Sequence, residues 1–201
     1  MAADGVVVGV LSAACRRMWG FTPRMVPVIV DRMGPRQAVA WFAANMPRFL
    51  VSLHVLGPIR THLACITISL RNGCSYCAFS HAYALELIYL RDRGRLFPLG
   101  AATIATCLDM DGRELRRRLH DVLQRAGLHA EAIWVDRTLD LAEGARPAER
   151  DEARLAHLVR MVGTMNAIAI DGGIQPTGAH DPVNKNTELK ARHAAMWATT
   201  T

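Results

Sequence analysis

The chain has 201 residues, of which 51% are hydrophobic and 21% are charged. A chain of this length and composition can bury a core and is too apolar to stay disordered, so we expect one globular domain. The formal net charge of +6 comes mostly from arginines interspersed with acidic residues, and the basic cluster at 113–118 has no aromatic neighbour. Nucleic-acid grooves usually combine a continuous basic stripe with exposed aromatic residues, so we expect no nucleic-acid partner.

The first element along the chain is an apolar run at residues 6–15. It falls short of the roughly 20 residues that span a bilayer, so we expect no membrane partner. The segment before it carries Asp4 and no arginine or lysine, whereas a secretory signal peptide begins with positive charge. We therefore predict an N-terminal helix packed on the core of a cytoplasmic protein, in which thiols stay reduced.

Apolar residues recur at intervals of three and four along most of the chain, which predicts an all-α bundle of roughly seven to nine helices. Asn72-Gly73 is expected to form a left-handed C-terminal cap. Asp109 and Asp111 are alternative N-caps for a later helix, and Pro147 is expected in the first turn of another. The predicted helices cover residues 36–56, 59–70, 75–90, 111–126, 130–142 and 147–170, with a short apolar segment at 99–107.

The composition changes after Gly172-Gly173, where proline, threonine, asparagine and histidine become frequent. We therefore assign residues 1–173 to a single helical domain. Residues 174–201 are expected to form a polar C-terminal arm that includes a short helix near 188–197.

The stretch NGCSYCAFSH at residues 72–81 contains the residues best suited to chemistry. Side chains three, four and seven apart share one face of a helix, so a helix that begins near Cys74 aligns Cys74, Cys77 and His81. The positive end of a helix dipole and its unpaired N–H groups stabilise a thiolate in the first turn. His81 could accept a thiol proton or stabilise the thiolate, which predicts a redox-active cysteine pair.

This pattern, N-G-C-x-x-C-x-x-x-H, closely resembles that of the alkylhydroperoxidase D and carboxymuconolactone decarboxylase superfamily, with specific similarity over about residues 61–85. The resemblance implies an all-α, alkylhydroperoxidase D-like homo-oligomer (dimer, trimer or hexamer) with no bound cofactor or metal. It also implies an antioxidant, peroxiredoxin-type oxidoreductase that reduces organic hydroperoxides. In that cycle Cys77 attacks the hydroperoxide, Cys74 closes a disulfide, His81 relays protons, and an external dithiol, a protein or a lipoyl-type group, restores the pair.

One position departs from the family pattern, because His62 stands where the family commonly has a glutamate. On a hairpin that turns at Asn72-Gly73, His62 and His81 can face each other. A histidine does not supply the fixed negative charge that raises a partner's basicity. Either His62 is a weaker orienting partner or efficient peroxidase chemistry is lost, and on this basis His62→Glu is expected to restore or raise thiol reactivity.

Three alternatives remain open from the sequence. A tetrahedral zinc site could draw its ligands from the soft donors His62, Cys65, Cys74, Cys77 and His81. A decarboxylase-like lyase would use the histidines instead of the cysteines. A redox-sensing or interaction protein without enzymatic activity would use the disulfide as a conformational switch, and the absent glutamate favours this third alternative.

Overall fold

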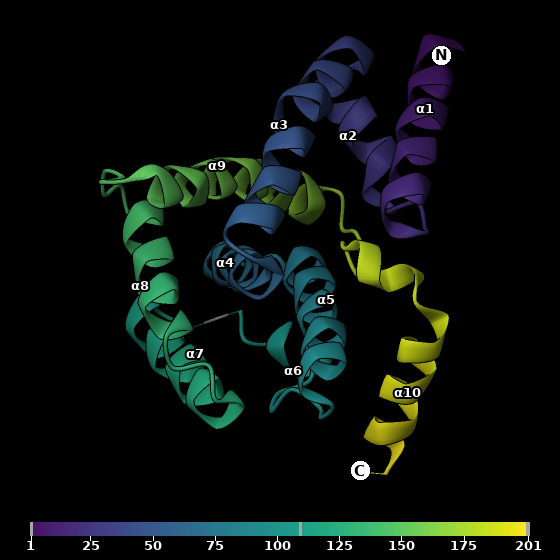
Figure 1. Ribbon diagram of the computed structural model, residues 1–201. Helices are drawn as coiled ribbons and strands as arrows, with labels where there is room; N and C mark the ends of the chain where they lie inside the picture. The colour runs from purple at the N-terminus through teal and green to yellow at the C-terminus, as the bar shows by residue number, and fades with distance from the viewer. Residues whose placement is uncertain (1, 109, 200–201) are drawn as a thin grey trace.

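The computed structural model describes residues 2–108 and 110–199. Every element of secondary structure assigned within these ranges is a helix. Figure 1 shows the arrangement. The elements are α1 (Ala2–Trp19), α2 (Met25–Met33), α3 (Pro35–Val55), α4 (Pro58–Arg71), α5 (Ser75–Arg93), α6 (Ala101–Ile104), α7 (Gly112–Ala126), α8 (Glu131–Ala142), α9 (Arg150–Asp171), the 3-10 turn η1 (Pro182–Lys185) and α10 (Thr187–Ala198). The all-α prediction is confirmed.

The described ranges contain ten α-helices, which is more than the expected seven to nine. The excess comes from short elements, because α2 has nine residues and α6 has four. Such helices are too short to give a clear 3.6-residue apolar period. The expected N-terminal helix is present as α1, which buries Leu11, Cys15 and Trp19.

The hairpin of α4 and α5 forms the centre of the fold, and the turn between its helices explains where the cysteines lie. Asn72 ends α4, and Gly73 adopts φ of 73°, the left-handed conformation that was predicted for this cap. The Cys74 N–H donates to Ser69 O at 2.8 Å and the Gly73 N–H donates to Leu70 O at 3.1 Å. These two bonds are those of a Schellman motif, and they deliver Cys74 directly to the start of α5.

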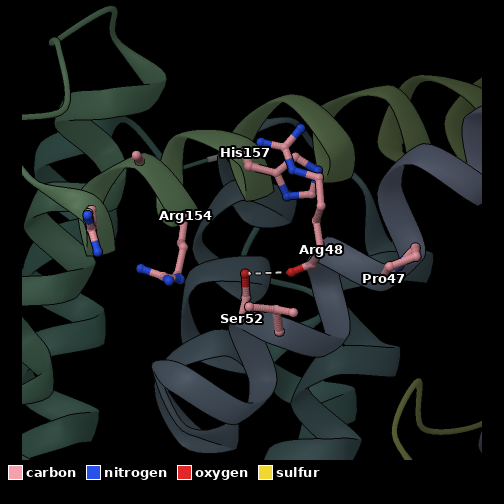
Figure 2. A pocket seen from close by; sticks show the side chains of 8 residues that line it. Pro47, Arg48, Ser52, Arg154 and His157 are labelled. Carbon is pink, nitrogen blue, oxygen red and sulfur yellow. Dashed lines mark hydrogen bonds between the residues drawn. The ribbon is translucent and has the colours of Figure 1, made fainter.

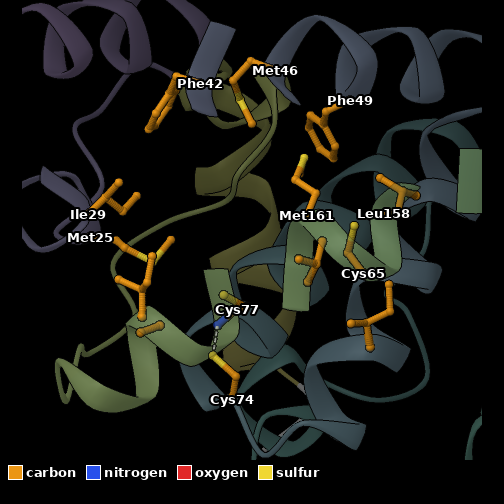
Figure 3. Close-up of a cluster of buried hydrophobic side chains, with 14 of the residues drawn as sticks. Met25, Ile29, Phe42, Met46, Phe49, Cys65, Cys74, Cys77, Leu158 and Met161 are labelled. Carbon is orange, nitrogen blue, oxygen red and sulfur yellow. Dashed lines mark hydrogen bonds between the residues drawn. The ribbon is translucent and has the colours of Figure 1, made fainter. Parts of the chain in front are cut away.

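Two apolar cores flank this hairpin. One lies between α4, α5 and α9 on one side and α1, α2 and α3 on the other, and the other joins α4 and α5 to α6, α7 and α8. Helix α9 runs across α4 and contacts α3, with Arg154 and His157 on the side that faces Arg48 and Ser52 of α3 (Figure 2). The cysteine pair belongs to the first of these cores (Figure 3).

The C-terminal arm packs more closely than its polar composition suggests. It returns from the end of α9 along α5, where Ala179, Val183 and Leu189 are buried against apolar residues of that helix (Figure 1). The His180 N–H donates to Ser80 O at 3.3 Å, and Asn184 Nδ2 donates to Trp19 O at 2.8 Å. The arm is therefore fixed between α5 and α1, and the predicted short helix is present as α10.

Two details of the predicted helix ends can be compared with the structure. Asp111 is the N-cap of α7, with its carboxylate accepting from the N–H groups of Arg113 and Glu114, whereas Asp109 lies outside the described residues. The prediction for Pro147 was wrong, because α9 begins only at Arg150. The Ala148 N–H instead donates to the Glu152 side chain, which holds this segment outside the helix.

Within the described residues, no helix has the combination of length and apolarity that crossing a membrane requires.

Candidate active site

The two cysteines lie at the N-terminus of α5, as the sequence predicted. Cys74 is the N-cap, with extended backbone angles, and its Sγ accepts a hydrogen bond from the Cys77 N–H at 3.5 Å (Figure 3). Both thiols are free, and both residues are almost completely buried. A sulfur in this position accepts hydrogen bonds from backbone N–H groups and lies at the positive end of the helix dipole. Both interactions stabilise a negative charge on it.

The environment distinguishes the two thiols. A hydrogen bond from the Cys77 thiol outweighs burial and, with help from backbone N–H groups and Asn166, lowers the pKa of Cys74 to about 7. The same thiol–thiol hydrogen bond, together with burial, raises the pKa of Cys77 well above its usual value. When the pair loses its first proton, the thiolate is therefore favoured on Cys74 and the remaining proton on Cys77.

We expect Cys77→Ala to raise the pKa of Cys74 from about 7 toward 9.0, because the thiol that donates to it is removed. Alkylation of Cys74 by iodoacetamide, followed by mass spectrometry as a function of pH, should then slow about tenfold at pH 7. Cys77→Ser is the matched control. Its hydroxyl still donates a hydrogen bond to Cys74, so the pH midpoint of Cys74 alkylation should stay closer to 7. Equal midpoints for the two variants would contradict this account of the pair.

The two cysteines border different cavities. Cys74 borders a surface hollow of about 190 Å³ that lies between the start of α5 and the segment after α9. Cys77 and His81 border a second cavity of about 30 Å³, which is lined mainly by aromatic and methionine side chains. Its other lining residues are Trp19, Met25, Met46, Phe49, Met161, Val162, Met165 and His180. The two thiols are therefore reached from different directions.

His62 and His81 meet across the α4–α5 hairpin, as the sequence predicted. Their Nδ1 atoms are 3.0 Å apart, and His62 is completely buried. Both rings are in hydrogen-bond contact with each other, so one Nδ1 donates and the other accepts. Within residues 2–108 and 110–199, no direct hydrogen bond joins His81 to either cysteine, although His81 and Cys77 share the small cavity.

A carboxylate that the sequence analysis did not identify completes this chain of groups. Asp181, in the C-terminal arm, places Oδ2 3.0 Å from His62 Nε2. Its Oδ1 accepts from the Val183 N–H at 2.7 Å, which fixes the carboxylate at the start of η1. The negative charge that His62 lacks is therefore present in the structure, one residue further from His81.

The charge of Asp181 fixes the direction of the hydrogen bonds. Burial raises the pKa of the Asp181 carboxyl. The hydrogen bond from His62, the positive charge that His62 can carry and the hydrogen bond from the Val183 N–H together outweigh burial and lower this pKa below its usual value. An ionised carboxylate only accepts, so His62 Nε2 carries a proton. When His62 is neutral, its Nδ1 accepts from the His81 Nδ1–H, which leaves the lone pair of His81 on Nε2.

A histidine of the C-terminal arm, His180, lines the same small cavity as Cys77 and His81. Its Nε2 is 3.1 Å from the Tyr76 hydroxyl, and its ring contacts the rings of His81 and Trp19. Burial, followed by the charge of His62, lowers the pKa of His180 to about 3, and burial raises the pKa of Tyr76 far above its usual value. Tyr76 therefore donates to a neutral His180, and neither group adds charge to the site.

His81 is also neutral at physiological pH. Burial lowers its pKa well below 6.5, and a positive charge on the neighbouring His62 or His180 would lower it further. A neutral imidazole with a free Nε2 is a hydrogen-bond acceptor and a proton acceptor. His81 can therefore receive a proton from a group in the cavity if the resulting positive charge is passed on to another residue.

Asn166 of α9 is a further residue that the sequence analysis missed. It is buried, its side chain lowers the pKa of both thiols, and its Oδ1 accepts from Asn72 Nδ2 at 3.0 Å. Its Nδ2 donates to Ser69 Oγ at 3.2 Å. Asn166 thus connects α9 to the turn before Cys74 and stabilises the thiolate form of the pair.

The structure does not bring the five residues of the proposed zinc site together. In the part of the chain that it describes, no group of three or more histidine, cysteine, aspartate or glutamate side chains is placed to hold a metal ion. Cys65 is buried inside α4, and burial raises the pKa of its thiol far above the usual value, which disfavours the thiolate that binds zinc.

Comparison of the chain with protein-family models, with curated proteins and with solved structures found no match. The resemblance to the alkylhydroperoxidase D and carboxymuconolactone decarboxylase superfamily therefore stays a prediction from residues 72–81 and their surroundings. The chemistry of this site has to be inferred from its own geometry.

Proposed function

We propose that the chain is a thiol-dependent peroxidase that reduces hydroperoxides through a Cys74–Cys77 disulfide cycle. The observation that supports this most strongly is the hydrogen-bonded chain Asp181–His62–His81, which ends at the cavity that His81 shares with Cys77. A buried carboxylate behind two imidazoles gives a proton taken up at the cavity a stable destination. A structural core has no need of such a path.

The proton path follows from the tautomers. His81 Nε2 accepts a proton from Cys77, directly or through a water in the cavity, and the His81 Nδ1 proton passes to His62 Nδ1 over 3.0 Å. The positive charge then lies on His62, beside Asp181 at 3.0 Å. His81 itself returns to a neutral state, which agrees with the low pKa that burial gives it.

The two cysteines supply both of the electrons that reduce the peroxide. The Cys77 thiolate attacks the terminal peroxide oxygen, the O–O bond breaks, and the alkoxide or hydroxide takes a proton as Cys77 becomes a sulfenic acid. The Cys74 thiolate then attacks the Cys77 sulfur, forms the disulfide and expels hydroxide, which takes a proton from solvent to leave as water. The low pKa of Cys74 suits it to this second step.

The size of the cavity bears on the substrate. Its volume of about 30 Å³ is larger than the roughly 10–15 Å³ that a single water molecule needs. Hydrogen peroxide fits this space, whereas an organic hydroperoxide requires flexible neighbours such as Met46 and Met161 to move. We therefore propose hydrogen peroxide, rather than the bulky hydroperoxides that the resemblance implies, as the faster substrate.

The test is to mix reduced protein with equimolar hydrogen peroxide or cumene hydroperoxide and to follow disulfide formation by quenched alkylation and mass spectrometry. We expect a Cys74–Cys77 disulfide with both peroxides, formed at least about tenfold faster with hydrogen peroxide because no side chain has to move. Thiols that remain reduced with both would overturn the peroxidase proposal. A faster reaction with cumene hydroperoxide would overturn the substrate preference alone.

Single-cysteine variants assign the two roles in the same assay. With Cys74→Ser, dimedone should trap a sulfenic acid on Cys77, and with Cys77→Ser no adduct should form. An adduct on Cys74 in the second variant would exchange the roles, with the lower-pKa thiol attacking the peroxide.

Other parts of the proposal rest on the resemblance. They are a homo-oligomer and an external dithiol that restores the pair, while the proposed cytoplasmic location rests on the N-terminal sequence. The hollow beside Cys74, at about 190 Å³, gives such a dithiol a direct approach to that sulfur. The absent glutamate favoured the alternative of a non-enzymatic redox switch, and Asp181 supplies a carboxylate to the same pair of histidines.

A further inference from the structure

A third cavity lies on the surface between α3 and α9, apart from the cysteines. It has a volume of about 360 Å³, and Figure 2 shows the side chains that border it. Its lining residues are Pro47, Arg48, Val51, Ser52, Arg150, Ala153, Arg154 and His157. Small-molecule sites commonly fall between about 300 and 1,000 Å³, so this hollow is large enough for a small ligand.

The hollow is positively charged. Three of its lining residues are arginines, and the one ion pair among them joins Arg154 to Asp151 at 3.0 Å. Within residues 2–108 and 110–199, neither Arg48 nor Arg150 forms an ion pair with a carboxylate. Asp151 offsets the charge of Arg154, so the guanidinium groups of Arg48 and Arg150 carry the uncompensated charge. Guanidinium groups bind carboxylates and phosphates through paired N–H donors.

His157 adds a buried polar group without a partner at the edge of this hollow. Asn45 Nδ2 donates to Trp41 O at 2.8 Å, which turns Asn45 Oδ1 toward His157 Nε2 at 3.0 Å. Nε2 therefore carries the proton, and Nδ1 is an acceptor that has no hydrogen-bond partner in the described structure. Burial, then the charges of Arg48 and Arg160, lowers the pKa of His157 to about 4. Unpartnered buried polar atoms are uncommon in folded proteins, and this acceptor is satisfied by a hydrogen-bond donor such as a water molecule in the hollow.

The rest of the lining is apolar. Pro47 and Val51 of α3 and Ala153 of α9 face the same hollow as the arginines. An inorganic ion would leave these surfaces in water, whereas an anion with a hydrocarbon body would cover them. The lining therefore suits a molecule with one anionic end and one apolar end.

We propose that the hollow between α3 and α9 binds a small organic carboxylate, with its anionic group on Arg48 and Arg150 and its hydrocarbon body against Pro47, Val51 and Ala153. The site is independent of the proposed peroxidase chemistry, because it involves neither cysteine and neither histidine of the relay. Binding is therefore expected without peroxide and in reduced and oxidised protein alike.

The test is calorimetric titration of the full chain with octanoate and, as the uncharged counterpart, 1-octanol. Octanoate should bind at least about tenfold more tightly than 1-octanol. Added salt should weaken the binding of octanoate and leave that of 1-octanol unchanged. Arg48→Gln and Arg150→Gln should each lower the octanoate affinity about three- to tenfold, while 1-octanol binding stays unchanged. Both side chains are exposed, so circular dichroism should show intact helices.

Arg118→Gln is the matched control, since it removes one exposed positive charge from α7 at a distance in sequence and fold from the hollow. It should leave the octanoate affinity within twofold of the unmodified chain. Absence of octanoate binding, equal affinities for octanoate and 1-octanol, or an equal loss in Arg118→Gln and Arg48→Gln would each overturn the proposed site.

Discussion

Replacing Asp181 with asparagine is expected to lower the rate constant for disulfide formation with hydrogen peroxide about 100-fold, the lower part of the range for losing a general base. The reason is the direction of the hydrogen bonds. Asparagine Nδ2 would donate to His62 Nε2 where the carboxylate accepted from it at 3.0 Å. His62 would then carry its proton on Nδ1 and donate to His81 Nδ1, leaving the proton of neutral His81 on Nε2 and no free acceptor at the cavity.

The asparagine variant separates this effect from damage to the fold. Its Oδ1 can still accept from the Val183 N–H, the bond of 2.7 Å that holds the arm at η1. Asp171→Asn is the control, because Asp171 forms an exposed ion pair with Arg32 and is not one of the hydrogen-bonded groups of the relay. Quenched alkylation should show the control within twofold of the unmodified chain. An equally small change in Asp181→Asn would mean that the carboxylate does not direct the relay.

The part of the site that the sequence predicted is the part set by local structure. Helix periodicity and the Asn72-Gly73 cap determine that α4 and α5 form a hairpin, with Cys74 at the start of the second helix. Because both helices have a fixed rise per residue, His62 and His81 had to lie at comparable distances from the turn. Their contact at 3.0 Å follows from these local rules.

The residues that the sequence did not reveal come from distant segments. Asp181 is 119 positions from His62 along the chain, and Asn166 is 97 positions from Ser69. The arm that carries Asp181 has no apolar period, so nothing in its pattern predicts its path across α5. That path depends on tertiary contacts, such as the bond from Asn184 to Trp19 O, which only the folded chain shows.

These contacts change how the histidine at position 62 is interpreted. From the sequence alone, His62 stood in place of a needed carboxylate, and the relay was expected to be weakened. In the structure, His62 instead transmits the charge of Asp181 to His81, since its two ring nitrogens contact one partner each at 3.0 Å. A carboxylate–imidazole–imidazole chain can move a proton by one step at each ring, so the extra ring lengthens the path without ending it.

The sharpest test of this interpretation is His62→Glu, which the sequence alone predicted to raise thiol reactivity and which we now expect to lower it about 100-fold. The new carboxylate would lie in a fully buried position beside Asp181. Two carboxylates at such a distance do not both ionise, so they would share a proton with each other rather than accept one from His81. Disulfide formation with hydrogen peroxide, followed by quenched alkylation, measures the loss.

Combining His62→Glu with Asp181→Asn should then recover at least about tenfold of the lost rate, because the asparagine amide donates to the new carboxylate and leaves its second oxygen for His81. Two changes that are each harmful would together be less harmful than either alone. That sign of coupling requires the two positions to act on His81 in series, as the bonds from Asp181 to His62 and from His62 to His81 imply. Losses that simply add in the double variant would exclude the relay and would leave Asp181 with only its role in fixing the arm to η1.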